Sequence, residues 1–307
     1  MSTKTSLTFV YVFLFVSPCL AADRMVPVDG APIHISESGA GSTVIFESGM
    51  GEGTATWNDV LPAIAKFAHT VAYDRPGIGQ SPTTTRPRRV TRMAADLHDL
   101  LHTARIAPPY VLVGHSLGGA IIQVYAHRYP REVAGLVLVD PEDGRLIQLL
   151  HSRMSADDWA SRRKALDQAL PKMPPAIRAE LKAADESGKA VSQSAHLPPV
   201  PVVILSGTKK NPEFPGNPLE QDLKLELHND LVAQTPGAKH ILVPKSRHYI
   251  QNDDPEVVIQ AVLEVLRTAK GTAKADPLKS GNRHRTRWAA TRENSDGIQA
   301  NESRAAD

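Results

Sequence analysis

Residues 114–119 read GHSLGG, and this stretch decides the expected fold of the 307-residue chain. It follows the β-branched run 110–113 (YVLV) and precedes 120–129 (AIIQVYAHRY), which we predict to be a strand and an amphipathic helix. A serine at a tight turn from strand to helix needs small neighbours, because the backbone is strained and the adjacent elements approach closely. Glycines two residues before and after the serine fill these places. We therefore predict that Ser116 is a nucleophile exposed above the sheet, beside the N–H groups of the following helix.

Short apolar runs recur on both sides of this stretch. Each run has about four residues and is bounded by Gly, Pro or polar residues. Longer helical stretches separate the runs, which is typical of a parallel sheet covered by helices. Continuous apolar runs are expected of strands buried on both faces, so we predict that all of them are inner strands. The predicted strands are 43–46, 70–73, 110–113, 136–139, 202–205 and 240–243.

The strand pattern stops between residues 140 and 200, where the chain becomes charged, rich in Ala and Leu, and interrupted by prolines. We predict that residues 141–197 form a helical cap inserted into a core of residues 25–140 and 198–270. An insertion at the carboxyl end of a strand lies where open α/β sheets bind ligands. The expected fold class is therefore α/β, with a mostly parallel central sheet, helices on both of its faces and an inserted helical cap.

The two ends of the chain differ from this core in composition. Residues 1–22 contain Lys4, an apolar run at 7–16 and small residues near the end, which predicts a signal peptide and an exported protein. The run is too short to span a bilayer comfortably, so we expect no stable membrane insertion after cleavage. An uncleaved anchor and lipidation of Cys19 are the alternatives. Residues 271–307 are basic and poor in large apolar residues, which predicts a disordered tail.

Bulk composition excludes several classes of function. The 35 basic and 33 acidic residues give a net charge of +2, so no strong field calls for nucleic acid as a partner. Cys19 is the only cysteine, which excludes an intrachain disulfide and a thiolate metal cluster. The chain has neither the His-Glu-x-x-His metal spacing nor a phosphate-cradling loop. We expect no metal and no cofactor.

Two further motifs accompany the serine turn. Residues 47–51 (ESGMG) follow one predicted strand, and residues 73–81 (YDRPGIGQS) follow the next. In this order, the three motifs resemble those of the α/β-hydrolase superfamily, in its cap-bearing, esterase-like branch. The resemblance covers roughly residues 28–268.

The resemblance assigns roles to these motifs. It implies that the backbone N–H groups of Met50 and Leu117 bind an oxyanion. The family more often has His-Gly in the first motif, but Ser48 in place of the histidine matters little for a backbone donor. The second motif is expected to be structural, with its Asp and Arg fixing a loop near the site through hydrogen bonds.

A histidine near the C-terminal end of the core is the expected general base. A serine hydroxyl is a poor nucleophile at neutral pH unless an imidazole takes its proton. His248 lies in the segment 246–250 (SRHYI), a few residues after the predicted strand 240–243. The family places its histidine on the loop after its last strand, and the order of serine and then a distant histidine also fits.

The acid of the expected triad departs from the common pattern. Many relatives place it after the strand that corresponds to 202–205, but the chain has no acid there until Glu213. Asp140 ends the preceding strand, and some relatives, certain haloalkane dehalogenases among them, place their acid at this point. The pair Asp140-Pro141 is equally typical of a helix N-cap followed by proline. Asp140 is our first candidate, and the alternatives are Glu213, Glu142 and Asp143.

These residues predict acyl transfer from a small-molecule ester or related compound, with water releasing the acyl-enzyme. Trp57 and Trp159 are candidates for the lining of the substrate pocket, although aromatic residues in such places also serve as packing. A thioesterase or acyltransferase would use the same groups. A ligand-binding or receptor-like protein on the same fold is the alternative from another class.

Overall fold

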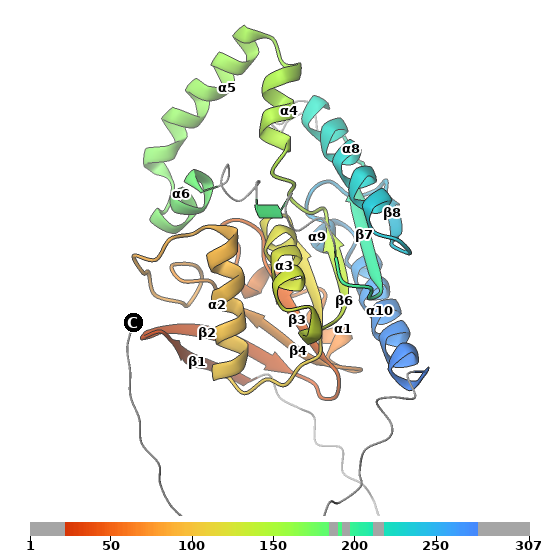
Figure 1. Ribbon diagram of the computed structural model, residues 1–307. Coiled ribbons are helices and arrows are strands. Elements are labelled where there is room, and N and C mark those ends of the chain that lie inside the picture. The colour runs from red at the N-terminus through yellow and green to blue at the C-terminus, as the bar shows by residue number, and fades with distance from the viewer. Residues whose placement is uncertain (1–21, 184–189, 192–196, 211–217, 276–307) are drawn as a thin grey trace, which may run out of the picture.

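A computed structural model describes residues 22–183, 190–191, 197–210 and 218–275 (Figure 1). The predicted leader therefore lies outside the described residues except for Ala22, and so does the predicted tail beyond residue 275. Residues 271–275 continue the last helix. Cys19 and Glu213 also lie outside the described part of the chain.

One eight-stranded sheet forms the centre of the molecule, with strand order β1-β2-β4-β3-β5-β6-β7-β8. Strand β2 pairs antiparallel with both β1 and β4, and all other neighbours are parallel. The mostly parallel sheet is thus confirmed. The strands are β1 (Ala22–Val28), β2 (Ala31–Ser38), β3 (Thr43–Glu47), β4 (His69–Tyr73), β5 (Tyr110–His115), β6 (Val133–Val139), β7 (Val202–Gly207) and β8 (Lys239–Val243).

The six predicted strands are all present, but the prediction that all are inner strands is wrong for β8. This strand lies at the edge of the sheet, and Leu242 on it is 53% exposed. The antiparallel pair β1 and β2 was not predicted. Both strands carry many polar or exposed residues, so neither contains the continuous apolar run expected of an inner strand.

Helices cover both faces of the sheet. One apolar cluster joins it to α2 and α3, and a second joins the opposite face to α1 and α10. Helix α3 is buried from Leu117 to Ala126, so it is a central buried helix and not the amphipathic one predicted. Among the described helices, none is both long and apolar enough to cross a membrane. The core helices are α1 (Leu61–Ile64), α2 (Val90–Thr103), α3 (Leu117–Arg128), α8 (Pro218–Gln234), α9 (Ile250–Asp253) and α10 (Pro255–Ala275), with 3-10 turns η1 (Thr54–Trp57) and η2 (Pro130–Glu132).

The insertion between β6 and β7 is helical in its described part. It contains α4 (Leu146–Arg153), α5 (Ala156–Ala169), η3 (Leu170–Lys172) and α6 (Pro175–Lys182). These helices rise above the sheet in Figure 1, on the side where β6 and β7 end. Helix α4 packs against α8 through a small apolar cluster, which is separate from the two clusters of the sheet.

Candidate active site

The turn at Ser116 has the strained geometry expected of a nucleophile. Its φ is 49°, in the left-handed region that non-glycine residues rarely adopt, and β5 ends just before it while α3 begins just after it. A Cβ added to Gly114 would lie 2.6 Å from the carbonyl oxygen of Gly118, and one added to Gly118 would lie 2.2 Å from that of Glu47. The two glycines are therefore required by the close approach of the backbone.

The structure brings His248 and Asp140 together, although 108 residues separate them in the sequence. His248 Nδ1 lies 2.6 Å from Asp140 Oδ2, while the backbone N–H of Gly207 donates to Asp140 Oδ1 at 3.1 Å. Because a carboxylate only accepts, Nδ1 carries the proton and Nε2 is left to accept one. Asp140 has a φ of 44° and is almost fully buried. It follows β6 as Ser116 follows the neighbouring strand β5, so two strained residues lie at the same edge of the sheet.

Asp140 does not act as a helix N-cap, since the next helix, α4, begins only at Leu146 with Arg145 at its cap position. The competing N-cap interpretation is therefore wrong. Of the alternative acids, Asp143 pairs with Arg145, and no hydrogen bond joins Glu142 to His248 within the described residues. Glu213 lies outside the described part of the chain.

The hydroxyl of Ser116 and the ring of His248 do not form a hydrogen bond in the described structure. The residue before Ser116, His115, has its ring centroid 4.6 Å from that of His248. Catalytic hydrogen bonds are often loose in a protein without its substrate. The ring of His115 is held on both sides, because its Nε2 donates to the carbonyl oxygen of His248 and its Nδ1 contacts Glu52 Oε2, each at 3.0 Å.

A lysine on α8 joins this pair. Lys224 Nζ lies 2.9 Å from Asp140 Oδ2 and 3.1 Å from His248 Nδ1, with 15% of its side chain exposed. An ammonium group only donates, so Lys224 and the Nδ1–H of His248 compete for the same carboxylate oxygen. No sequence motif marks this lysine, and its only local signal is its position beside Leu223 and Leu227 on a helix between two strands.

The charges of this group shift the pKa of each member. Burial and the nearby Lys224 ammonium lower the pKa of His248 to about 4, against the raising effect of Asp140. Burial raises the pKa of Asp140, but Lys224 and His248 more than offset this effect and hold it well below its usual range. Burial lowers the pKa of Lys224, but the negative charges of Asp140 and Glu142 more than offset this effect and raise it above its usual value, so Lys224 stays charged.

The backbone N–H groups of Met50 and Leu117, the two predicted oxyanion donors, are unpaired in the described part of the chain. Leu117 opens α3, so its N–H is one of those that a helix leaves unpaired at its start. Both groups are thus free to bind an oxygen of a ligand.

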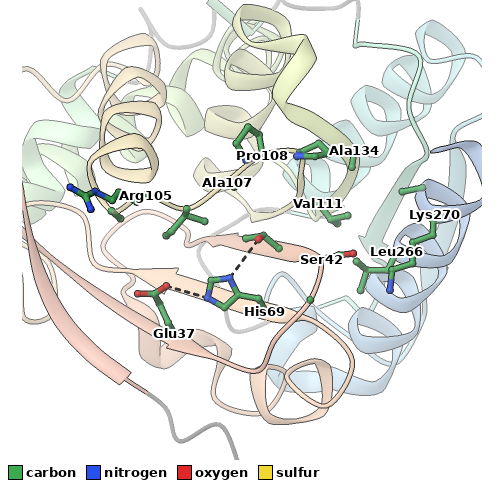
Figure 2. A pocket seen from close by; sticks show the side chains of 16 residues that line it. Glu37, Ser42, His69, Arg105, Ala107, Pro108, Val111, Ala134, Leu266 and Lys270 are labelled. Atoms are coloured by element: carbon green, nitrogen blue, oxygen red, sulfur yellow. Dashed lines mark hydrogen bonds and ion pairs between the residues drawn. The ribbon is translucent and has the colours of Figure 1, made fainter. Parts of the chain in front are cut away.

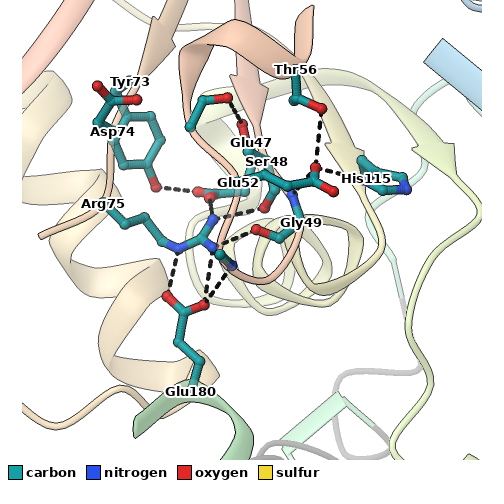
Figure 3. Close-up of polar contacts among 12 residues, drawn as sticks. Glu47, Ser48, Gly49, Glu52, Thr56, Tyr73, Asp74, Arg75, His115 and Glu180 are labelled. Carbon is teal, nitrogen blue, oxygen red and sulfur yellow. Dashed lines mark hydrogen bonds and ion pairs between the residues drawn. The ribbon is translucent and has the colours of Figure 1, made fainter. Parts of the chain in front are cut away.

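A buried ion network holds the Met50 loop, as Figure 3 shows. The Arg75 guanidinium donates to Glu47 Oε1 at 2.7 Å and to Glu180 Oε1 at 3.0 Å. It also donates to the carbonyl oxygens of Ser48 and Gly49. Because Glu180 belongs to α6, this network ties the cap to the loop that carries Met50.

The same glutamate reaches the loop directly. The backbone N–H of Gly51 donates to Glu180 Oε2 at 3.2 Å, and Arg88 donates to Glu180 Oε1 at 2.9 Å. Asp74, beside Arg75, accepts from the backbone N–H groups of Thr54 and Gln80. The expectation that the Asp and Arg of the second motif fix a loop near the site is therefore confirmed.

The prediction that Trp57 lines a substrate pocket is wrong. Its ring is fully buried in the apolar cluster beside α1 and α10, tilted against Phe46 at 5.2 Å, and its Nε1 donates to Ser48 Oγ at 3.0 Å. Trp57 therefore supports the Met50 loop from inside the core. Trp159 lies on α5 of the cap, partly buried against His151, and its part in substrate binding stays a prediction.

A cavity of about 570 Å³ lies elsewhere in the molecule (Figure 2). Its lining includes Thr43, Val111 and Ala134, which stand near the beginnings of β3, β5 and β6. Ser116 and Asp140 follow the far ends of β5 and β6. This cavity is therefore not the substrate site of the residues described above.

Comparison with known proteins agrees with the fold described above. A family model described as alpha/beta hydrolase fold matches residues 42–194. The uncharacterized protein YqjL of Bacillus subtilis strain 168 is 26% identical over 245 residues, which cover 79% of this chain and 91% of YqjL.

Two solved structures share the fold. A thermophilic esterase from Thermogutta terrifontis superposes with a TM-score of 0.56 at 20% identity, covering 81% of this chain and 99% of the esterase. The epoxide hydrolase CorEH gives a TM-score of 0.61 at 16% identity, covering 80% of this chain and 99% of CorEH. Structural similarity at such low sequence identity indicates a shared fold and does not indicate a shared function.

Proposed function

The chain belongs to the α/β-hydrolase superfamily, and from this premise we propose that it is a serine hydrolase. It cleaves a carboxylic ester or a related acyl bond of a small molecule through an acyl-enzyme intermediate. The observation that carries this proposal is the meeting of His248 with Asp140 beside the strained turn at Ser116. A serine at this position directs the chemistry to acyl transfer, because an attacking hydroxyl forms an ester with the acyl group.

The proposed reaction proceeds in two halves. Ser116 Oγ attacks the carbonyl carbon while His248 Nε2 accepts its proton, and the N–H groups of Met50 and Leu117 bind the negative oxygen. His248 then returns the proton to the leaving alkoxide. In the second half, His248 takes a proton from water, the hydroxide attacks the acyl-enzyme, and the free acid leaves as Ser116 regains its proton. Asp140 holds the imidazole in the required tautomer throughout.

Two other functions are compatible with the same fold, and a test must distinguish each of them from ester hydrolysis. A thioesterase or acyltransferase would form the same acyl-enzyme and differ only in leaving group or acceptor. A ligand-binding or receptor-like protein would bind the ligand with little turnover. The oriented histidine supports the enzyme, since a binding protein has no need of a general base.

The test combines covalent labelling with turnover. We expect a fluorophosphonate probe to label the protein, and a series of aryl esters of increasing acyl length to be hydrolysed. Ser116→Ala should abolish both, whereas the matched control Ser161→Ala, at an exposed serine on α5, should change neither. Labelling without ester turnover would favour thioester or acyl-transfer chemistry, which a thioester panel with added alcohol acceptors would reveal. Absence of both labelling and turnover in the folded protein would contradict the proposal.

We further propose that the protein is exported by the leader at residues 1–22. Expression of the full chain in a bacterial host, followed by N-terminal sequencing of the protein outside the cytoplasm, tests this proposal. A mature N-terminus close to Ala22 is expected. An intact leader on membrane-bound protein would show an uncleaved anchor instead.

A further inference from the structure

Three potential metal ligands meet on the surface at the end of α2. His98 and His102 are one helical turn apart on α2, and Glu132 comes from η2, thirty residues further along the chain. Glu132 Oε1 lies 3.0 Å from His102 Nε2 and 3.5 Å from His98 Nε2. The ligand atoms of the three residues all lie within 4.8 Å of one another.

The surroundings orient two of these ligands towards the group. His98 Nδ1 contacts Asp99 Oδ1 at 3.3 Å, which leaves Nε2 of the same ring to face the group. Metal-binding histidines characteristically donate their second N–H to such a carboxylate. The ring of His98 also stacks on that of Tyr129, with centroids 4.0 Å apart and planes 15° apart. Its orientation is therefore largely fixed before any ion binds.

A hydrogen bond also orients the carboxylate of Glu132. The Tyr125 hydroxyl donates to Glu132 Oε2 at 2.5 Å, so one carboxylate oxygen is occupied and Oε1 is turned towards the histidines. Glu132 Oε1 is thus the carboxylate oxygen that faces both imidazole rings.

We propose that His98, His102 and Glu132 form a binding site for a divalent transition-metal ion of the Zn²⁺ type. Zn²⁺ binds imidazole nitrogen and carboxylate oxygen at about 2.0–2.2 Å in a tetrahedron, so neighbouring ligand atoms are roughly 3.3 Å apart. The two histidine-to-glutamate distances, 3.0 and 3.5 Å, lie on either side of this value. The side chain of His102 is 52% exposed and is free to turn towards the ion, and water takes the fourth position.

The site lies far from the proposed active site and does not depend on it. Glu132 stands immediately before β6 and Asp140 immediately after it, and the seven residues of β6 span about 23 Å. The ion would join the C-terminal turn of α2 to the segment that leads into β6. Binding to the folded chain alone would raise its stability by mass action.

Local sequence patterns did not predict this site. His98 and His102 have the four-residue spacing that places two side chains on one helix face, but the third ligand comes from another element. The alternative is a surface cluster in which the two histidines simply hydrogen-bond to Glu132. That cluster would show no saturable affinity for a metal ion.

Titration of the untagged full chain with ZnCl₂ and CoCl₂ separates the two. We expect one Zn²⁺ per chain by calorimetry, a higher melting temperature, and the visible bands of tetrahedral Co²⁺. His102→Ala should weaken binding by about tenfold or more, and Asp99→Asn should weaken it by roughly tenfold through the orientation of His98. The matched control His127→Ala, at an exposed histidine on α3, should bind as the parent protein does.

Two results would overturn the proposal. One is Zn²⁺ affinity in a folded His98→Ala/His102→Ala variant equal to that of the parent protein. The other is a Co²⁺ complex without tetrahedral bands. Ester hydrolysis is measured alongside but does not decide the outcome, because the metal site and the proposed function can each fail alone.

Discussion

Replacement of Lys224 by methionine should move the acid limb of the pH–rate profile to higher pH. The ammonium group lies 3.1 Å from His248 Nδ1 and opposes protonation of the imidazole. Methionine keeps much of the apolar stem and removes the charge. Without a positive neighbour the imidazolium form is favoured, so the pKa of His248 rises and the active neutral base is lost at higher pH than before.

Coulomb's law gives a lower bound for this shift. At 3.1 Å, and with the dielectric constant of water, two unit charges interact by about 1.3 kcal/mol, which is ~1 pKa unit. The bulk value suits a lower bound because 35% of the His248 side chain is exposed and solvent screens the pair. Starting from a pKa of about 4, the neutral fraction at pH 4.5 falls from roughly three-quarters to one-quarter. Activity at that pH should therefore drop by about threefold relative to its own high-pH plateau.

The assay is kcat/KM for an uncharged aryl ester between pH 3.5 and 9, which reports the pKa of the free enzyme. Lys239→Met, which removes an exposed charge paired with Glu264, is the matched control and should leave the limb in place. The position of the limb is the deciding quantity, because a structural role for Lys224 would lower the plateau without moving the limb. An unshifted or downward-shifted limb in a folded Lys224→Met protein would refute the reasoning.

Three further substitutions test the site. Asp140→Asn should lower kcat by about 10⁴-fold with an unchanged circular dichroism spectrum, and a near-normal rate would transfer the acid role to another residue. Glu180→Gln leaves the buried Arg75 without one of its two carboxylate partners and should cost ~3–5 kcal/mol in urea unfolding; a loss below about 1 kcal/mol would contradict the network. Gly118→Ala places a Cβ 2.2 Å from the Glu47 carbonyl oxygen, so fluorophosphonate labelling should be lost, and normal labelling would show that the turn tolerates a side chain.

Local sequence was sufficient for the features that a few consecutive residues control. The strained turn at Ser116 requires glycines on either side, and any backbone with that geometry imposes the same requirement. The six apolar runs predicted six strands because a strand buried on both faces needs a continuous run. The same criterion did not predict β1 and β2, because their residues are largely polar or exposed. It wrongly predicted β8 to be an inner strand, because the apolar run of β8 lies at the edge of the sheet.

Only the tertiary structure decided which distant side chains meet. Asp140 was one acid among several in the sequence, and its selection depends on the end of β6 lying beside the loop that carries His248. Lys224 and Glu180 reach the site from α8 and α6, at positions that no local motif marks. The physical reason is the range of the interactions: backbone strain and strand burial act within a few residues, whereas hydrogen bonds and ion pairs depend on how whole elements pack.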